Sequence, residues 1–350
     1  MTRVARSALT TLLLAVGFTA SATWASCLDK PRLTGVNLAG AEFNTKKLPG
    51  TIFKDYTYPN SKEMAYIANQ GANIIRLPFR WERLQPSLNG GFDAAELKRI
   101  QNTVTQAQAN DLCVLLDVHN YAKYYSDAIT APEMQEAFVQ FWVKLAQQVN
   151  NPDYVALGLM NEPAHIPLAT WAALAKRTLA GLRESGANHL VVVGGGGWNG
   201  LHSWFSESNG VSNAKAFADI KDPLNRIAIE AHQYADSYYS GTALDCHPPS
   251  HFEPRFARIS QWAKDNNLRL FLGEFGMAAT EPCLQTLERF LQLMEGTEWL
   301  GWTYWAAGSW WGSYAFALNT DSPTPSAQWS LLKNYFYRAN TSPPHAPTQR

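Results

Sequence analysis

Two glutamates, Glu162 and Glu274, are the residues whose types and positions best suit chemistry. Each follows a short and nearly uncharged apolar run. A single Glu in such a place is typical of a helix cap or a surface ion pair. Two of them can divide the work of glycosidic bond cleavage, since one carboxyl protonates the leaving oxygen while the other stabilises or attacks the oxocarbenium-like centre. The pair therefore predicts glycoside hydrolysis, provided that both side chains reach one cleft.

The elements that must position this pair alternate along the chain. Eight short apolar runs, often β-branched, are typical of parallel strands buried on both faces, and they cover residues 33–38, 73–77, 112–118, 155–160, 189–193, 226–231, 268–273 and 299–305. Amphipathic stretches predict helices over residues 61–70, 93–110, 133–149, 168–184, 252–266 and 284–294. Ser61 and Asp93 have the positions and residue types of N-caps.

This alternation predicts an α/β protein with a single-domain (β/α)8 TIM barrel. Catalytic groups of such barrels lie at the carboxyl ends of the strands, and strands four and seven would hold Glu162 and Glu274 across the cleft from each other. A doubly wound open sheet is the alternative, but no Gly-x-Gly-x-x-Gly fingerprint follows the first strand. The run Gly194–Gly197 is expected to be a flexible turn.

Composition narrows the class of ligand. The 350 residues include 29 Lys and Arg against 29 Asp and Glu, so the formal net charge is zero. Nucleic acid and anionic membranes select for a basic surplus, and neither is expected as a partner. Because 12% of the residues are aromatic and only 17% are charged, a flat and uncharged ligand such as a sugar ring is expected. No linker or repeat divides the chain, and we expect a monomer.

The amino terminus predicts export. Arg3 and Arg6 precede an apolar run from Ala8 to Ala20, which is typical of a signal peptide over residues 1–26. The alternative is a lipoprotein-type leader that would be processed before Cys27 and would anchor the protein to a membrane. We expect secretion.

A catalytic domain over residues 27–340 would then be followed by a flexible tail at 341–350. Export also bears on the cysteines, because oxidising compartments favour disulfides. Cys246 and Cys283 lie in loop-like stretches and are expected to pair, whereas Cys113 lies within an apolar run and is expected to be a buried free thiol.

Residues at the strand ends form an ordered set of motifs: Arg76-Leu77-Pro78, His119-Asn120-Tyr121, Asn161-Glu162-Pro163, His232-Gln233-Tyr234, Gly273-Glu274-Phe275-Gly276 and Trp305. Together they resemble glycoside hydrolase family 5, the large cellulase family of retaining (β/α)8 enzymes. Residues 35–43, 55–59 and 240–242 are similar to its secreted endo-β-1,4-glucanase branch. The resemblance extends from about residue 33 to residue 329.

The resemblance implies that Glu162 is the acid/base and Glu274 the nucleophile of a double displacement on β-1,4-glucan. Arg76 would keep the neighbouring carboxylate of Glu274 ionised. The residues expected to support catalysis are Arg76, His119, Asn161, His232 and Tyr234. Among these, Asn161 should bond the sugar 2-hydroxyl and Tyr234 should donate to Glu274, while the alternative for each His is a buried core imidazole.

Aromatic rings should form the substrate platform, because a flat ring covers the apolar face of a pyranose. The residues expected to bind substrate are Asn37, Tyr121, Trp198, His202, Trp305 and Trp310, with Trp305 stacked beside the scissile bond. Trp204, Tyr238 and Trp311 are further candidates, for which ordinary core packing is the alternative.

Other functions stay open at this point. A metal-dependent hydrolase would use His247 and His251, but no metal and no cofactor are expected. A non-catalytic carbohydrate-binding barrel would not need both glutamates. Mannan, xyloglucan and mixed-linkage glucan are alternative substrates, because loop shape decides among them. Ala164 also separates His165 from the Asn-Glu-Pro motif, where the related branch often has a His directly after Pro.

Overall fold

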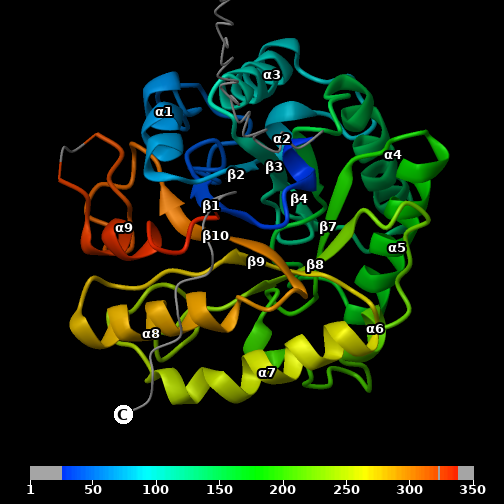
Figure 1. Ribbon diagram of the computed structural model, residues 1–350. Helices are drawn as coiled ribbons and strands as arrows, with labels where there is room; N and C mark the ends of the chain where they lie inside the picture. Colours follow the sequence, from blue (N-terminus) through cyan, green and yellow to red (C-terminus); the bar gives the residue numbers. More distant parts are fainter. Residues whose placement is uncertain (1–25, 322–323, 338–350) are drawn as a thin grey trace, which may run out of the picture.

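Eight parallel strands close into a barrel surrounded by helices, as the apolar runs predict (Figure 1). The computed structural model describes residues 26–321 and 324–337, so the expected tail and all but the last residue of the expected leader lie outside the described residues. In chain order the strands are β1 (Leu33–Leu38), β2 (Ile74–Phe79), β3 (Cys113–Val118), β6 (Val155–Gly158), β7 (Leu190–Gly194), β8 (Ile227–His232), β9 (Leu270–Glu274) and β10 (Trp299–Ala307). Because β1 pairs with both β2 and β10, the sheet has no free edge and the (β/α)8 barrel is confirmed.

The six expected helices are present, with ends shifted by at most three residues. They are α1 (Ser61–Gln70), α3 (Ala94–Gln108), α4 (Pro132–Gln148), α5 (Leu168–Glu184), α7 (Pro249–Asp265) and α8 (Glu281–Leu293). Shorter elements lie in the loops: α2 (Trp81–Leu84), α6 (Asn213–Phe217), α9 (Ala327–Leu332), the turns η1 (Cys27–Asp29) and η2 (Leu201–Ser203), and a hairpin of β4 (Lys123–Tyr124) and β5 (Asp127–Ala128).

Helix starts follow from local hydrogen bonds. Asp93 caps α3, as expected, by accepting from the Glu96 amide at 2.8 Å. The cap of α1 is Asn60 and not Ser61, because the Asn60 side chain accepts from the Glu63 amide while the Glu63 carboxylate accepts from the Asn60 amide.

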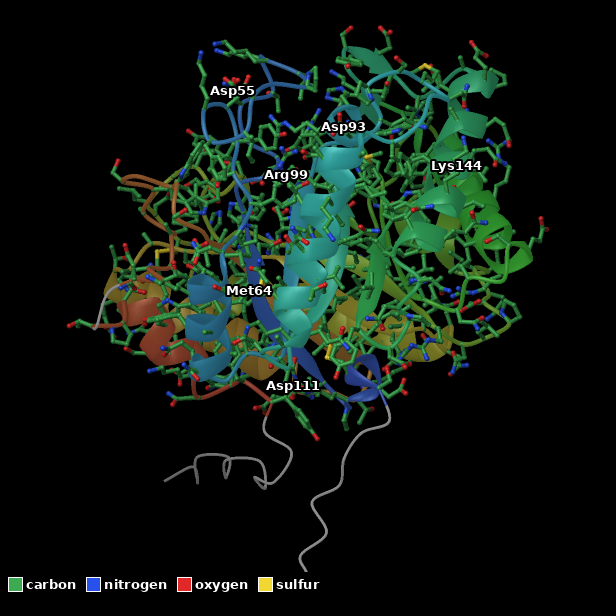
Figure 2. All side chains as sticks on the ribbon, turned by 90° about the horizontal axis from the view of Figure 1, so that it is seen from above. Asp55, Met64, Asp93, Arg99, Asp111 and Lys144 are labelled. Atoms are coloured by element: carbon green, nitrogen blue, oxygen red, sulfur yellow. A yellow bond between two sulfur atoms is a disulfide. The ribbon has the colours of Figure 1, made fainter. Side chains whose placement is uncertain are left out.

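The helices run opposite to the strands and so begin at the carboxyl ends of the barrel. In Figure 2, Asp93 at the start of α3 and Asp55 in the loop after β1 lie at one end of the molecule, and Asp111 beyond the end of α3 lies at the other. The βα loops therefore gather at one face, where the strand-end motifs also lie.

Side chains inside the barrel change character from one end to the other. Near the amino ends of the strands, all eight strands contribute to one buried apolar cluster, which we call the floor: Cys27, Leu28, Leu33, Ile74, Cys113, Leu115, Ala156, Leu190, Val192, Ala228, Phe271 and Leu300. Their neighbours along each strand point outward and pack against the helices. This alternation is the two-residue period of a strand.

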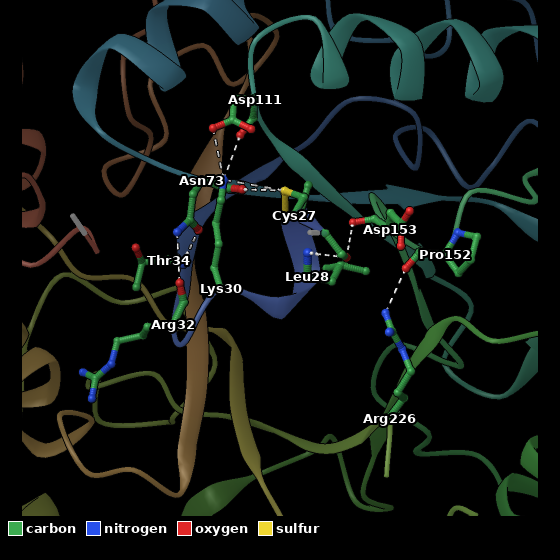
Figure 3. The surroundings of a disulfide bond; sticks show 12 residues. Cys27, Leu28, Lys30, Arg32, Thr34, Asn73, Asp111, Pro152, Asp153 and Arg226 are labelled. Atoms are coloured by element: carbon green, nitrogen blue, oxygen red, sulfur yellow. Dashed lines mark hydrogen bonds and ion pairs between the residues drawn. A yellow bond between two sulfur atoms is a disulfide. The ribbon is translucent and has the colours of Figure 1, made fainter. Parts of the chain in front are cut away.

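A disulfide between Cys27 and Cys113 lies in the floor, with Cα atoms 5.8 Å apart (Figure 3). Cys113 is buried as expected, but the prediction of a free thiol was wrong. The turn η1 brings Cys27 beneath β3, where the Leu28 amide donates to the carbonyl of Asp153 at 3.1 Å. The expected Cys246–Cys283 disulfide is present.

The glycine run after β7 is a turn, but it is closely packed and not loose. The Gly196 amide donates to Asn213 Oδ1 at 2.8 Å, and a Cβ added to Gly195 would lie 2.5 Å from the ring of Trp204. Trp204 is fully buried and packs edge-on against Trp262, so it belongs to the core and does not extend a cleft. Among the helices that the structure describes, none combines the length and apolar character needed to cross a bilayer.

Candidate active site

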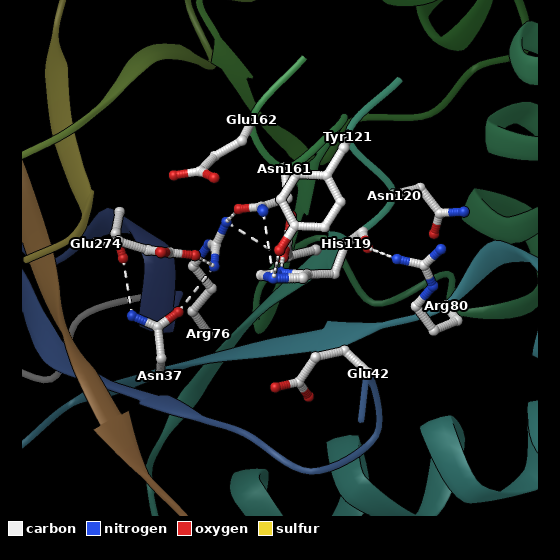
Figure 4. Close-up of polar contacts among 12 residues, drawn as sticks. Asn37, Glu42, Arg76, Arg80, His119, Asn120, Tyr121, Asn161, Glu162 and Glu274 are labelled. Atoms are coloured by element: carbon white, nitrogen blue, oxygen red, sulfur yellow. Dashed lines mark hydrogen bonds and ion pairs between the residues drawn. The ribbon is translucent and has the colours of Figure 1, made fainter. Parts of the chain in front are cut away.

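Glu162 and Glu274 meet at the carboxyl end of the barrel, where both side chains point into the same space (Figure 4). Glu162 follows β6 and Glu274 ends β9. His232 joins them, since its Nδ1 lies 2.9 Å from Glu162 Oε1 and 3.7 Å from Glu274 Oε2. One oxygen of each carboxylate and a ring nitrogen of His232 all lie within 4.8 Å of one another. The two strands thus deliver both carboxyls to a single site.

Arg76 is the fully buried cation beneath this pair. It donates to Glu274 Oε1 at 2.8 Å and to Asn161 Oδ1 at 2.8 Å, and it lies 3.2 Å from Asp117 and 3.1 Å from Glu230. Burial alone would lower the pKa of Arg76, but the three carboxylates outweigh burial and raise it. Arg76 therefore carries a permanent charge that three acidic side chains share.

Two of those acids, Asp117 and Glu230, were absent from the residues expected at the site. Asp117 precedes His119 by two residues with Oδ2 2.8 Å from Nδ1, and Glu230 precedes His232 by two residues with Oε1 3.1 Å from Nε2. Residues at i and i+2 of a strand share a face, so the Asp-x-His and Glu-x-His patterns were the signal that could have found both acids.

The space that Glu230 occupies exists because its neighbour on β9 is a glycine. A Cβ added to Gly273 would lie 1.8 Å from Glu230 Oε1, a distance at which no side chain fits. The residue directly before Glu274 thus makes room for a carboxylate from β8.

The two histidines have opposite charge states. Burial opposes a charge on His232, but the nearby carboxylates of Glu274, Glu162 and Glu230 outweigh it and raise the pKa of His232 to about 10. Burial lowers the pKa of His119 to about 3. At neutral pH His232 is therefore an imidazolium that donates to Glu162 and Glu230, and His119 is a neutral ring.

The tautomer of His119 follows from its partners. Because Nδ1 lies 2.8 Å from Asp117, we assign the proton to that nitrogen, which leaves Nε2 to accept from the hydroxyl of Tyr121 at 3.1 Å or from Nδ2 of Asn161 at 3.2 Å. His119 thereby links the buried acids to the rim of the cleft.

The environments of the two catalytic candidates differ. Burial raises the pKa of Glu162, and the charge of Glu274 adds to that effect, although the hydrogen bond from His232 opposes it. Glu274 accepts 2.8 Å hydrogen bonds from Arg76 and from the hydroxyl of Tyr234. The Glu162 carboxyl thus has a raised pKa, whereas the Glu274 carboxyl is held between a cation and a hydroxyl.

A cavity of about 360 Å³ extends from Glu162 along the loops after β6, β7 and β8. Its lining includes Glu162, Trp198, His202, Tyr234 and Tyr238. The Trp198 ring is half exposed, and the His202 ring stacks on Tyr239 with centroids 4.3 Å apart. The cavity therefore offers flat rings close to the carboxyl pair.

The remaining predicted substrate residues lie in different places. The half-buried Trp305 stacks parallel to His119 with centroids 5.5 Å apart, and Trp311 packs edge-on against it. Trp310 is 40% exposed in the loop after β10. Asn37 is fully buried, and its amide donates to the carbonyl of Gly273 at 2.8 Å while its Oδ1 accepts from Arg76. Its contacts therefore suit the positioning of Arg76 and not contact with a sugar.

Metal ligation is a poor match for these groups. Glu162, His232 and Glu274 are the one group in residues 26–321 and 324–337 with suitable ligand atoms close enough together. The carboxylates around His232 raise its pKa, and a cation would have to displace a proton from its ring in order to bind there. His247 and His251 stack face to face with centroids 4.2 Å apart, and His251 Nε2 lies 2.7 Å from the hydroxyl of Tyr239.

Comparison with known proteins identifies the family. The family model described as Cellulase (glycosyl hydrolase family 5) matches residues 36–309. The chain belongs to this family of glycoside hydrolases. It is 30% identical over 305 residues to endo-beta-1,4-glucanase B of Aspergillus niger, a match that covers 86% of this chain and 89% of the relative.

Solved structures agree with this membership. XacCel5A in complex with cellopentaose superposes with a TM-score of 0.84 and 43% identity, and the match covers 87% of this chain and 99% of that one. The endo-beta-1,4-glucanase Xac0029 from Xanthomonas axonopodis pv. citri also has a TM-score of 0.84, with 41% identity over 87% of this chain and 98% of that one. The resemblance drawn from the strand-end motifs is therefore confirmed.

Proposed function

We propose that this member of the cellulase family is a secreted endo-β-1,4-glucanase that cleaves internal bonds with retention of anomeric configuration. The observation that carries the proposal is the closeness of Glu162 and Glu274, which have one oxygen each within 4.8 Å. Retaining enzymes hold their two carboxyl groups about 5–5.5 Å apart, whereas inverting enzymes need about 6.5–9.5 Å to admit a water. The separation supports double displacement.

In the first step Glu274 attacks the anomeric carbon while Glu162 gives its proton to the leaving glycosidic oxygen. The charge on Glu162 then lies 2.9 Å from the His232 imidazolium, which stabilises it. In the second step Glu162 takes a proton from water, and that water breaks the bond between the sugar and Glu274. Arg76 and Tyr234 hold Glu274 in place both when it attacks as the nucleophile and when it departs as the leaving group.

Two roles in binding follow from position. We assign the sugar 2-hydroxyl to Asn161, whose Oδ1 is held by Arg76. We propose that Trp305 stacks on the sugar ring beside the scissile bond and that Trp198 and Tyr121 contact the next sugar rings. The names of the curated relatives and the cellopentaose bound in XacCel5A support a β-1,4-glucan chain as the substrate.

The disulfides support an extracellular location, because such bonds persist in oxidising compartments. Cys27 also bears on the lipoprotein alternative, since a sulfur bonded to Cys113 cannot carry a thioether-linked lipid. We therefore propose that the protein is released and not anchored. We also propose that it is a monomer and that it acts without a metal or an organic cofactor.

Replacement of the nucleophile tests the proposal. Glu274→Gln keeps the shape of the side chain but removes the attacking anion, so hydrolysis of hydroxyethyl cellulose should fall by at least about 10³-fold. Binding of cellopentaose, measured by calorimetry, should persist. Glu136→Gln on the exposed side of α4 is the control and should keep full activity. Full activity of Glu274→Gln would refute the assignment.

Two further measurements address mechanism and substrate. Proton NMR of cellopentaose hydrolysis should show the β-anomer first, and initial release of the α-anomer would refute retention. Rates on mixed-linkage glucan, mannan, xyloglucan and xylan should be lower than on soluble cellulose derivatives. A faster rate on any of them would reassign the substrate while leaving the chemistry intact.

A further inference from the structure

A second cavity, of about 550 Å³, lies beside the catalytic cleft among the loops that follow β1, β2, β3 and β6. Its size falls within the range of pockets that bind small molecules, about 300–1,000 Å³. We call it the side cavity. Tyr121 and His165 line it, and each of these rings also lies 5.8 Å from the ring of Trp198, which lines the catalytic cavity. A group attached to a chain in the cleft can therefore reach the side cavity.

The side cavity is lined by basic groups. Lys46, Arg80 and Lys123 contribute to the lining, and none of its ten described lining residues is Asp or Glu. At the same face, Lys47 is paired with Asp55. Lys46 and Lys123 form no ion pair with any carboxylate in the described part of the chain. Two ammonium charges thus face this space without a protein counter-ion.

Arg80 forms the inner wall. It is 4% exposed, donates to the carbonyl of His119 and lies 3.3 Å from Glu82, so its charge is balanced. Its Nε has no hydrogen-bond partner among the described residues, but that atom is buried and does not open onto the side cavity. Beside it, Lys123 adds to the effect of burial in lowering the pKa of His165.

We propose that the side cavity binds a carboxylate-bearing substituent of the polysaccharide, so that the enzyme prefers acidic, substituted β-1,4-glucans over neutral ones. The carboxylate would lie between Lys46 and Lys123, above the wall that Arg80 forms. A neutral hydroxyl would gain less there, because it cannot balance two ammonium charges. This inference rests on the proposed glucanase function, and it concerns a group that hangs from the cleaved chain.

A pair of lysine substitutions tests the preference. The Lys46→Gln/Lys123→Gln variant should lower the ratio of kcat/KM on carboxymethyl cellulose to kcat/KM on hydroxyethyl cellulose by about threefold to tenfold, chiefly through KM. The control is Lys98→Gln/Lys144→Gln, which removes the same charge from exposed positions on α3 and α4. That control should keep the wild-type ratio. In about 1 M NaCl the difference between the two variants should disappear, because salt screens exposed charges.

An unchanged ratio in Lys46→Gln/Lys123→Gln, or an equal fall in the control, would overturn the proposal. A separate binding measurement distinguishes this failure from failure of the glucanase function. In a Glu274→Gln background, gels that contain carboxymethyl cellulose should retard the protein more than gels with hydroxyethyl cellulose, and substitution of both lysines should abolish that excess. Equal retardation with and without the lysines would also overturn the proposal that the side cavity binds carboxylates. This outcome does not depend on whether the wild type hydrolyses either polymer.

Discussion

The inside of the barrel has two halves built on the same strands. Along β3, Leu115 belongs to the floor and is followed two residues later by Asp117; along β8, Ala228 is followed in the same way by Glu230 and then His232. The lower half is apolar and carries a disulfide. The upper half is a network of buried charges that ends at Glu274.

The halves differ in what they contribute. Burial of apolar groups in the floor stabilises the fold by about 25 cal/mol per Å² removed from water. Each buried ion of the upper half costs several kcal/mol of desolvation, which is offset only while its partners remain. Stability should therefore depend on both halves, whereas catalysis should depend directly on the upper half alone.

The largest effect is expected from the loss of Arg76. Arg76→Met leaves Asp117, Glu230 and Glu274 buried without their shared cation, so the free energy of unfolding should fall by about 3–5 kcal/mol and activity should be lost. Urea denaturation measures the first effect and hydroxyethyl cellulose assays the second. Arg289→Met is the control, because Arg289 pairs with Glu253 at 2.8 Å where both side chains are partly exposed, at 38% and 43%, and its loss should cost less than about 1 kcal/mol. Equal losses in the two variants would contradict the proposed role of the network.

A smaller effect is expected in the floor, and it should spare catalysis. Leu115→Ala removes a fully buried side chain and leaves a cavity, so the free energy of unfolding should fall by about 2–5 kcal/mol. The value of kcat at 25 °C should stay at the wild-type level, since the Leu115 side chain lies in the apolar floor. A large fall in kcat would show that the two halves do not act separately.

The third effect is a dependence of stability on pH. The pKa of His232 is about 10 in the folded protein, above the ordinary value of about 6.5 for His, so its contribution is present in full below pH 6.5 and is lost as pH rises toward 10. Glu230→Gln removes one carboxylate beside His232 and should lower the pKa of that histidine. The stability that His232 contributes should then be lost at lower pH. Urea denaturation between pH 6 and 10 would measure the shift.

Leu115→Ala provides the matched control for that experiment, because it should lower the free energy of unfolding equally at every pH. The shape of the plot of unfolding free energy against pH should stay the same. Lysines and tyrosines elsewhere titrate equally in both variants and cancel in the comparison. Identical curve shapes for Glu230→Gln and the wild type would show that His232 is not charged in the folded protein.

The fold could be predicted because its signals are local. Each strand is a short apolar run and each long helix has an apolar face, so all eight strands and the six main helices were found. Ends were less certain: β6 stops at Gly158 and not at residue 160, and Asn60 takes the cap expected of Ser61. The β4–β5 hairpin has only two residues in each strand and offers no periodicity to detect.

The site could be predicted where strand-end motifs mark it, as at Glu162 and Glu274. The Cys27–Cys113 disulfide joins residues 86 positions apart, and no spacing rule connects a residue ahead of the first strand with a residue of β3. The signal for Asp117 and Glu230 is their two-residue spacing from His119 and His232, which places each acid on the same face of its strand as the histidine. Local patterns thus do not predict contacts between residues that come together only when the barrel closes.

The missing side chain of Gly273 has a consequence for how this protein can change over generations. Any larger residue there would collide with Glu230, and any loss of Glu230 would alter the proton held by His232. Positions 230 and 273, on neighbouring strands, can therefore be exchanged only together. In a random library that varies one position at a time, substitutions of Gly273 should therefore yield no active variants. A library that varies both positions together could contain active ones.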